Sequence, residues 1–236
     1  MSQEPKRLAI IPARGGSKRI YQKNIAKFHG QPIIYYTLQA AQSSGLFDLI
    51  HVSTDSNLVF AIAKKLGFEP EFLRPSELAA DDTPLFPVLR HVVDKFAKLG
   101  NFFDEVWLLM PCAPLVEKRD LILASKLFAE TGGPILSVCE YPAPIEWAYQ
   151  QNADGRLYPI LSDKSTIRSQ DLGIKFYDAG IFAIYSAKEL MNDINFGRDL
   201  IFYGFHIDRM RAIDIDYESD WKYAEEIFKL IRLKND

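Results

Sequence analysis

The chain has 236 residues, of which 48% are apolar and 25% are charged, and its net charge is −3. These proportions exclude an intrinsically disordered chain, because enough apolar surface is present to offset the entropy cost of folding. The small net charge gives no indication of nucleic-acid binding.

The longest apolar runs are the size of strands, and the first residues contain no apolar stretch of signal-peptide length. We therefore expect neither a membrane span nor secretion. Two cysteines, Cys112 and Cys139, form neither a disulfide framework nor a zinc site by themselves, which favours a cytoplasmic protein.

The first part of the chain alternates predicted strands with predicted helices. A buried strand over 8–12 precedes a polar Gly-rich loop over 13–24, and a helix runs from about Pro32 to just before Gly45. The elements expected next are a strand over 49–54, a helix capped by Ser56 that ends at Gly67, a strand over 69–73, a loop over 74–84, a helix over 85–99, a strand over 106–110, a helix over 118–131 and a strand over 135–140.

This alternation breaks over 141–176, which is rich in proline and aromatic residues and contains the hairpin-turn signal Asp154-Gly155. The elements expected after it are a strand over 181–185, a helix over 187–192, a strand over 212–215 and a helix over 218–233. Repeated βα units predict a mainly parallel sheet between two helical layers. We interpret 1–236 as one α/β domain whose insertion at about 141–176 protrudes and forms subunit contacts.

The basic Gly-rich loop Arg14-Gly-Gly-Ser-Lys18 follows the first predicted strand. Ligands of open α/β sheets bind beyond the carboxyl ends of the strands, and glycines let backbone N–H groups face an anion. The loop is neither a Walker A sequence nor G-x-G-x-x-G, so a dinucleotide-dependent dehydrogenase is unsupported. A loop of this composition is most often a turn with solvated charges, but its position favours phosphate binding.

Asp214 and Asp216 are separated by one residue in the predicted strand 212–215 and its end. Side chains two apart share one face of a strand, so both carboxylates can address one hard cation. The alternative is an acidic strand end before a helix, where carboxylates are favoured anyway. Arg168, in the insertion, is a candidate for holding a substrate carboxylate, although an Arg on a loop is more often solvated.

The sequence resembles the cytidylyltransferases that activate nine-carbon acidic sugars as CMP derivatives. The opening Ile10-Ile-Pro-Ala-Arg-Gly-Gly-Ser-Lys-Arg-Ile20 with Lys23-Asn24 carries the resemblance. Further motifs follow in the same order over essentially the whole chain: Ser53-Thr-Asp55, Arg74-Pro-Ser-Glu-Leu-Ala79, Arg168-Ser-Gln170 and Asp214-Ile-Asp216. Within the family, the segments at 83–91, 141–145 and 168–171 are most similar to members that act on pseudaminic acid.

The resemblance implies a nucleotidyltransferase-type, Rossmann-like sheet and a role for each matching position. Phosphate binding and charge stabilisation fall to Arg14, Lys18 and Lys23, and the other nucleotide-binding positions are Gly15, Gly16, Ser17, Asn24, Arg74 and Thr83. Asp214 and Asp216 would bind Mg²⁺, for which Mn²⁺ can substitute. The sugar would contact Arg168, Gln170 and Asp178.

The implied reaction joins CTP to the anomeric hydroxyl of a nonulosonic acid, releases pyrophosphate and takes place in a homodimer. Asp216 and a metal-bound water are the candidates for the general base. Two departures from the family pattern are Tyr21, in place of a proline, and Met110, where sialate-activating members have a glutamine. The alternatives are activation of legionaminate, sialate or 3-deoxy-manno-octulosonate, transfer to a small phosphorylated alcohol, and a non-catalytic nucleotide-binding regulator.

Overall fold

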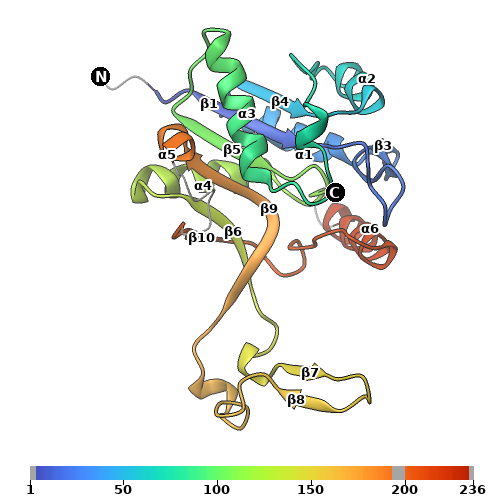
Figure 1. The fold of residues 1–236 in the computed structure, drawn as a ribbon, viewed down its shortest axis with the longest axis vertical. Coiled ribbons are helices and arrows are strands. Elements are labelled where there is room, and N and C mark those ends of the chain that lie inside the picture. Colours follow the sequence, from blue (N-terminus) through green and yellow to red (C-terminus); the bar gives the residue numbers. More distant parts are fainter. Residues whose placement is uncertain (1–3, 193–199, 234–236) are drawn as a thin grey trace.

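The centre of the protein is a six-stranded sheet with the strand order β10-β6-β9-β5-β1-β4 (Figure 1). The computed structural model describes residues 4–192 and 200–233. The strands are β1 (Arg7–Pro12), β4 (Leu49–Ser53), β5 (Glu105–Leu109), β6 (Ile135–Glu140), β9 (Phe176–Ser186) and β10 (Tyr203–His206). β9 runs antiparallel to both of its neighbours, β5 and β6, whereas the other pairings are parallel. The predicted mainly parallel α/β sheet is confirmed.

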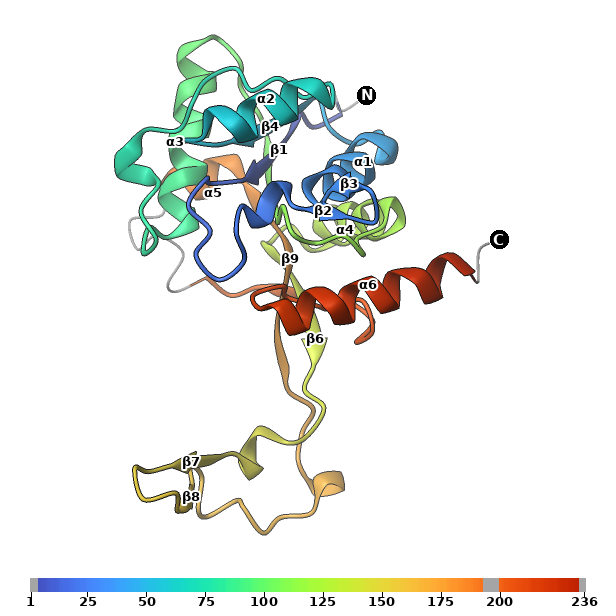
Figure 2. The same cartoon turned by 90° about the vertical axis from the view of Figure 1, so that its right-hand side faces the viewer.

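Helices cover both faces of this sheet. They are α1 (Ile34–Ser44), α2 (Asn57–Lys65), α3 (Leu85–Lys98), α4 (Lys118–Thr131), α5 (Ala187–Asn192) and α6 (Glu218–Leu233). In Figure 2, α1 and α4 lie on one side of the sheet and α3 and α5 on the other. Two buried apolar clusters correspond to these two layers, one including α1, α2 and α4 and the other including α3 and α5.

The local sequence explains where several helices begin and end. The hydroxyl of Ser56 accepts a hydrogen bond from the Val59 backbone at the start of α2. Glu117 and Asp120 form a reciprocal capping box at the start of α4, and Gly45 ends α1 with a φ of +67°. Short 3₁₀ turns are η1 (Lys23–Ile25), η2 (Ser76–Leu78), η3 (Ile145–Trp147) and η4 (Ser169–Asp171).

Three local predictions are wrong, and one strand of the central sheet was not predicted. Residues 69–73 form no strand, since Pro70 lacks a backbone donor. Residues 212–215 form no strand either, because β10 occupies the place beside β6. Pro32 belongs to the two-residue strand β3 (Gln31–Pro32), which pairs with β2 (Lys27–Phe28), so α1 begins later. β10 itself was missed, since four residues leave little pattern to detect.

The insertion projects from the sheet on the extended β6 and β9 strands (Figures 1 and 2). Its hairpin consists of β7 (Tyr149–Gln151) and β8 (Leu157–Pro159), and Gly155 in the turn has a φ of +84°. The predicted Asp-Gly turn is therefore confirmed. Large apolar side chains remain exposed along the segment: Trp147, Tyr149, Leu157, Tyr158, Ile160 and Ile174.

Candidate functional site

The basic loop leaves β1 at the carboxyl edge of the sheet and is held by three neighbouring groups. Gly15 lies so close to α2 that an added Cβ would be 2.8 Å from Cβ of Ser56. The Gly15 N–H donates to Oδ1 of Asp55 at 3.0 Å, and Nδ2 of Asn24 donates to the Arg14 carbonyl at 2.9 Å. The glycine at position 15 is thus required for this close packing against Ser56.

A cavity of about 250 Å³ lies beside this loop. Its walls come from β1, the 3₁₀ turn η1, the loop after η2, the segment after β5, Gly180 in β9 and the segment before α6. The predicted site residues that line it are Arg14, Ser17, Lys23, Asn24, Arg74, Thr83, Asp214 and Asp216. Elements far apart in the sequence therefore bring most of the predicted nucleotide and metal positions together.

The charges of this cavity and of Lys18, which lies outside its lining, form two clusters of ion pairs. Both Arg14 and Lys18 contact the carboxylate of Asp81. Asp216, from the segment before α6, accepts from Arg19 at 2.8 Å and lies 3.3 Å from Nζ of Lys23. Each of these four cations is therefore neutralised by a carboxylate of the same chain.

Asp214 and Asp216 reach the cavity from an extended segment rather than from a strand. Ile215 between them is fully buried in the core beneath α6, so the two carboxylates turn to the opposite side. Partial desolvation raises the pKa of Asp214, and the charge of Asp216 raises it further. The alternation predicted for a strand thus holds without strand pairing.

Gly180 lies next to Asp214 and has a left-handed backbone conformation. Its φ is +64°, and an added Cβ would lie 3.4 Å from Cγ of Asp214. Its backbone N–H donates to Oδ1 of Asp178 at 2.8 Å. Asp178 lines a second cavity of about 410 Å³, which shares Leu85, Met110, Gly180 and Asp214 with the first and is otherwise mostly apolar.

Arg74 is buried and supports the site from below. Its Nε and Nη2 donate to the hydroxyl and carbonyl of Ser53, at 3.1 and 2.6 Å. Burial lowers the pKa of Arg74 to about 10. The guanidinium therefore ties the segment before η2 to the end of β4 while it faces the cavity.

The structure does not bring Arg168 and Gln170 to either cavity of their own chain. Both are exposed at the 3₁₀ turn η4 in the insertion, and Nε of Arg168 lies 2.8 Å from Asp171. Sequence reasoning also left Arg19, Asp81 and Cys112 unassigned, although all three line the first cavity. The basic run at 18–19 was a signal for Arg19, whereas nothing local indicated Asp81.

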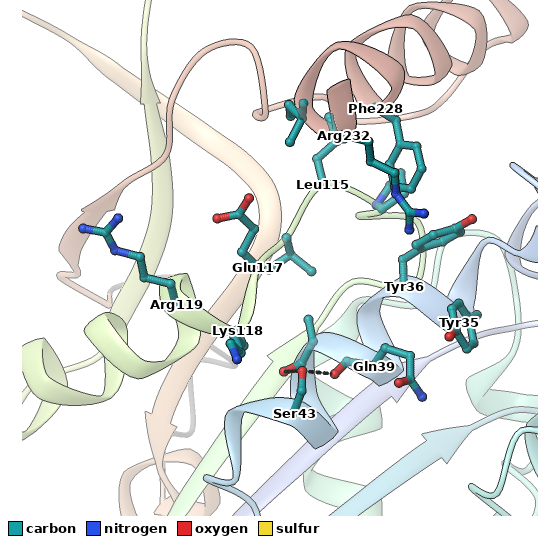
Figure 3. A pocket seen from close by; sticks show the side chains of 14 residues that line it. Tyr35, Tyr36, Gln39, Ser43, Leu115, Glu117, Lys118, Arg119, Phe228 and Arg232 are labelled. Carbon is teal, nitrogen blue, oxygen red and sulfur yellow. Dashed lines mark hydrogen bonds between the residues drawn. The ribbon is translucent and has the colours of Figure 1, made fainter. Parts of the chain in front are cut away.

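The largest described cavity, about 530 Å³, lies elsewhere, between α1, the segment 114–119 and α6 (Figure 3). Tyr36, Leu115 and Phe228 form much of its wall, and its lining includes no predicted site residue. Size alone therefore does not locate the site, and the charged cavity beside the basic loop is the candidate.

Residues 4–192 and 200–233 contain neither a membrane-spanning helix nor a cluster of metal-binding side chains. No helix among them is both long and apolar enough to cross a membrane. No group of three or more His, Cys, Asp or Glu side chains in the same ranges is arranged to hold a metal ion.

Comparisons with known proteins identify the family of this chain. The sequence profile of the cytidylyltransferase family matches residues 8–96. Pseudaminic acid cytidylyltransferase of Campylobacter jejuni (serotype O:2) is 32% identical over 95% of this chain and 97% of its own. CMP-N,N'-diacetyllegionaminic acid synthase of Legionella pneumophila is 30% identical over 94% of this chain and 96% of its own.

Among solved structures, CMP:2-keto-3-deoxy-manno-octonic acid synthetase in complex with CTP has a TM-score of 0.70 at 16% identity, covering 95% of this chain and 99% of its own. This likeness shows a shared fold. The identity to the curated relatives, which extends over nearly the whole of each chain, shows more: this chain belongs to the cytidylyltransferase family and is a nucleotidyltransferase.

Proposed function

We propose that the protein transfers CMP from CTP to the anomeric hydroxyl of a nonulosonic acid, with pseudaminic acid as the first choice, and releases pyrophosphate. The observation that carries the proposal is the cavity in which a basic loop faces Asp214 and Asp216 across the carboxyl edge of the sheet. The relatives named for pseudaminic and diacetyllegionaminic acid support the choice of acceptor. The same chemistry favours a cytoplasmic location, where CTP is made.

In this proposal Arg14, Lys18 and Lys23 bind the phosphates of CTP. All three come from the segment that follows β1, and their charges stabilise the negative charge that develops as the acceptor oxygen attacks the α-phosphate and pyrophosphate departs. Arg19 faces the same cavity and adds a fourth cation. The contacts of Asn24 with the Arg14 carbonyl and of Asp55 with the Gly15 N–H hold the backbone of this loop before CTP binds.

Asp214 and Asp216 fit a divalent cation, because both carboxylates face the same cavity. Mg²⁺ commonly binds to one or two carboxylates and completes its shell with waters and substrate phosphates, so Asp214 and Asp216 suffice as protein ligands. When bound there, Mg²⁺ or Mn²⁺ would neutralise phosphate charge and orient the triphosphate. The pairs of Asp216 with Arg19 and Lys23 keep this carboxylate on the cavity wall.

We infer that the acceptor sugar occupies the second, mostly apolar cavity. It opens from the first beside Met110 and Gly180, and Asp178 is its polar group nearest the shared wall. A thioether offers no amide hydrogen bond, so Met110 favours an acceptor with apolar substituents at this position.

Arg168 and Gln170 can reach a sugar only if another chain supplies them. We therefore propose a homodimer in which the insertion of one protomer lies over the cavities of its partner. The exposed aromatic residues Trp147, Tyr149 and Tyr158 support this proposal, because aromatic side chains are enriched in interface cores. Arg168 would then hold the sugar carboxylate as a bidentate fork.

A pyrophosphate-release assay tests the proposed function. The purified protein is incubated with Mg²⁺, each of the four ribonucleoside triphosphates and a panel of pseudaminic, legionaminic, sialic and 3-deoxy-manno-octulosonic acids. We expect turnover with CTP alone among the nucleotides, fastest with pseudaminic acid. If turnover is fastest with another sugar, that sugar replaces pseudaminic acid as the proposed acceptor. Absence of turnover with every acid contradicts the proposal.

A further inference from the structure

The carboxylate of Asp81 bridges two cations of the basic loop, Arg14 through Nη1 and Lys18 through Nζ. Asp81 comes from the loop between η2 and α3, far from the basic loop in sequence, and it lines the first cavity. One carboxylate oxygen faces each cation. Two oxygens of a phosphate group would contact the same two cations in the same way.

Among the described residues, the side chains of Arg14 and Lys18 form ion pairs and hydrogen bonds with no side chain other than Asp81. Lys18 is 81% exposed, and Arg14 and Asp81 are exposed by a third or more, so the cluster lies at the open mouth of the cavity. The hydrogen bonds from Lys18 and then Arg14 lower the pKa of Asp81, so the carboxylate is charged near neutral pH. An incoming phosphate must therefore compete with it.

We infer that Asp81 is an internal substitute for phosphate, which holds Arg14 and Lys18 in the empty enzyme, is displaced by the triphosphate and pairs with the two cations again as pyrophosphate leaves. The inference rests on the proposed role of Arg14 and Lys18 as phosphate ligands. Asp81 thereby lowers the affinity for CTP and pyrophosphate and keeps the basic loop from retaining the product.

The size of this effect follows from the exposure of the pairs. Exposed ion pairs each contribute little, and breaking two of them weakens phosphate binding by a factor between about 2 and 30. The effect is confined to ligands that carry the phosphates bound by Arg14 and Lys18. Cytidine has no phosphate and does not compete with Asp81.

The test compares Asp81→Asn with Asp82→Asn by titration calorimetry with inorganic pyrophosphate, CTP and cytidine, in EDTA and about 50 mM salt. Asp82 is exposed, has no side-chain partner in the described ranges and does not line the cavity, so its variant removes the same charge from the same loop. Asp81→Glu keeps the carboxylate and serves as the conservative variant.

We expect Asp81→Asn to bind pyrophosphate and CTP between about 2 and 30 times more tightly than the wild type. Cytidine binding should be unchanged, and Asp82→Asn and Asp81→Glu should remain within about twofold of wild type for every ligand. The gain should decrease at about 0.5 M salt, which a loosened loop would not explain. A melting temperature close to that of the wild type verifies that the variant is folded.

Pyrophosphate binding by Asp81→Asn that equals or is weaker than that of the wild type overturns the inference and leaves the phosphate-binding role of the loop intact. An equal gain in Asp82→Asn also overturns it, because the effect is then general electrostatics. If the wild type and all three variants fail to bind both pyrophosphate and CTP, the phosphate-binding part of the proposed function fails together with the inference.

Discussion

The thiol of Cys112 donates a hydrogen bond to Oδ1 of Asn24, with 3.2 Å between Sγ and Oδ1. Burial raises the pKa of this thiol to about 12, so it stays protonated and remains a donor. With Oδ1 engaged, the amide presents Nδ2 to the carbonyl of Arg14. A residue after β5 therefore fixes the orientation of the group that holds the phosphate loop.

Replacing this thiol tests whether it positions the loop. Cys112→Ala leaves Oδ1 of Asn24 without its donor, which costs about 1 kcal/mol, and we expect the KM for CTP to rise by about three- to tenfold with the sugar KM unchanged. Cys112→Ser keeps a donor and should restore most of the loss. Steady-state kinetics with each substrate varied in turn measures both. Equal defects in Ala and Ser would mean that Cys112 acts through packing alone.

Gly180→Ala should impair the site where β9 contacts Asp214. A φ of +64° is unfavourable for alanine by about 1–2 kcal/mol, and the new Cβ would lie 3.4 Å from Cγ of Asp214. We expect a lower melting temperature together with a loss of turnover of at least about tenfold, because relief of the strained backbone at position 180 shifts the wall against which Asp214 packs.

Gly155→Ala is the matched control for this change. Gly155 also has a positive φ, +84°, but lies at the tip of the β7–β8 hairpin, where the nearest atom to an added Cβ is Nε2 of Gln151 at 3.9 Å. Gly155→Ala should lose a similar amount of stability because of its positive φ, while turnover stays unchanged. Similar losses of turnover in both variants would show that backbone strain, and not the displacement of Asp214, is responsible.

His51 makes stability depend on pH. It is buried against Phe72 and Phe96, and neither ring nitrogen has a hydrogen-bond partner among the described residues. Burial lowers its pKa from 6.5 to about 3. The folded state therefore keeps His51 neutral where the unfolded chain would bind a proton.

Because this pKa is depressed in the folded protein, the stability that it provides is complete above pH 6.5 and is lost as the pH falls toward 3. Because one proton is involved, the free energy of unfolding changes by at most about 1.4 kcal/mol per pH unit through this group. Urea unfolding at several pH values should show that His51→Phe removes about that slope, whereas His206→Gln, at an exposed position, does not. An unchanged slope in His51→Phe would assign the acid sensitivity to other groups.

The features that were predicted correctly depend on single residues and their immediate neighbours in the sequence. Ser56, Gly45 and Gly155 indicated two helix ends and a turn, because caps and left-handed backbone depend on single residues. The Asp214–Asp216 spacing correctly predicted two carboxylates on one side of the chain. It did so although the predicted strand is absent, since any extended backbone alternates its side chains.

The features that sequence reasoning missed depend on contacts between distant segments. Asp81 meets Arg14 across 67 positions, and Lys23 meets Asp216 across 193. A single sequence contains no signal for such pairs. Arg168 shows the converse, since its motif indicates a sugar contact but the fold of one chain carries it away from the cavity.

Arg168 should therefore act in the partner's site. Arg168→Lys retains the charge but loses the bidentate fork, so we expect a large rise in the sugar KM with the CTP KM little changed. A loss of CTP binding with sugar binding preserved would instead assign Arg168 to the nucleotide.

Complementation distinguishes action within one chain from action across the dimer. Arg168→Ala and Asp214→Asn are each nearly inactive alone, but a co-expressed mixed dimer contains one cavity with Asp214 intact and the partner's Arg168 intact. We expect about a quarter of the wild-type activity from random pairing. No recovery, or a fully active monomer in sedimentation, would contradict the shared site.

The two carboxylates of the proposed metal site should differ in what they contribute to the empty protein. The pKa of Asp214 is raised by partial desolvation and by the charge of Asp216, so its ionised form is disfavoured without a cation. Asp216 instead accepts from Arg19 and Lys23. We therefore expect Asp214→Asn to melt at the wild-type temperature or slightly above it in EDTA, and Asp216→Asn to melt at or slightly below it.

Both variants should lose most turnover, because each keeps the size of the side chain and removes a charge that would bind the cation. Wild-type activity should disappear in EDTA and return with Mg²⁺ or Mn²⁺. The melting experiment separates a binding defect from an unfolded protein, and the metal titration separates a cation site from a charged chain end. If both variants turn over at near wild-type rates in Mg²⁺, the carboxylates are not metal ligands. The ion pairs of Asp216 with Arg19 and Lys23 then serve only to fix the segment before α6.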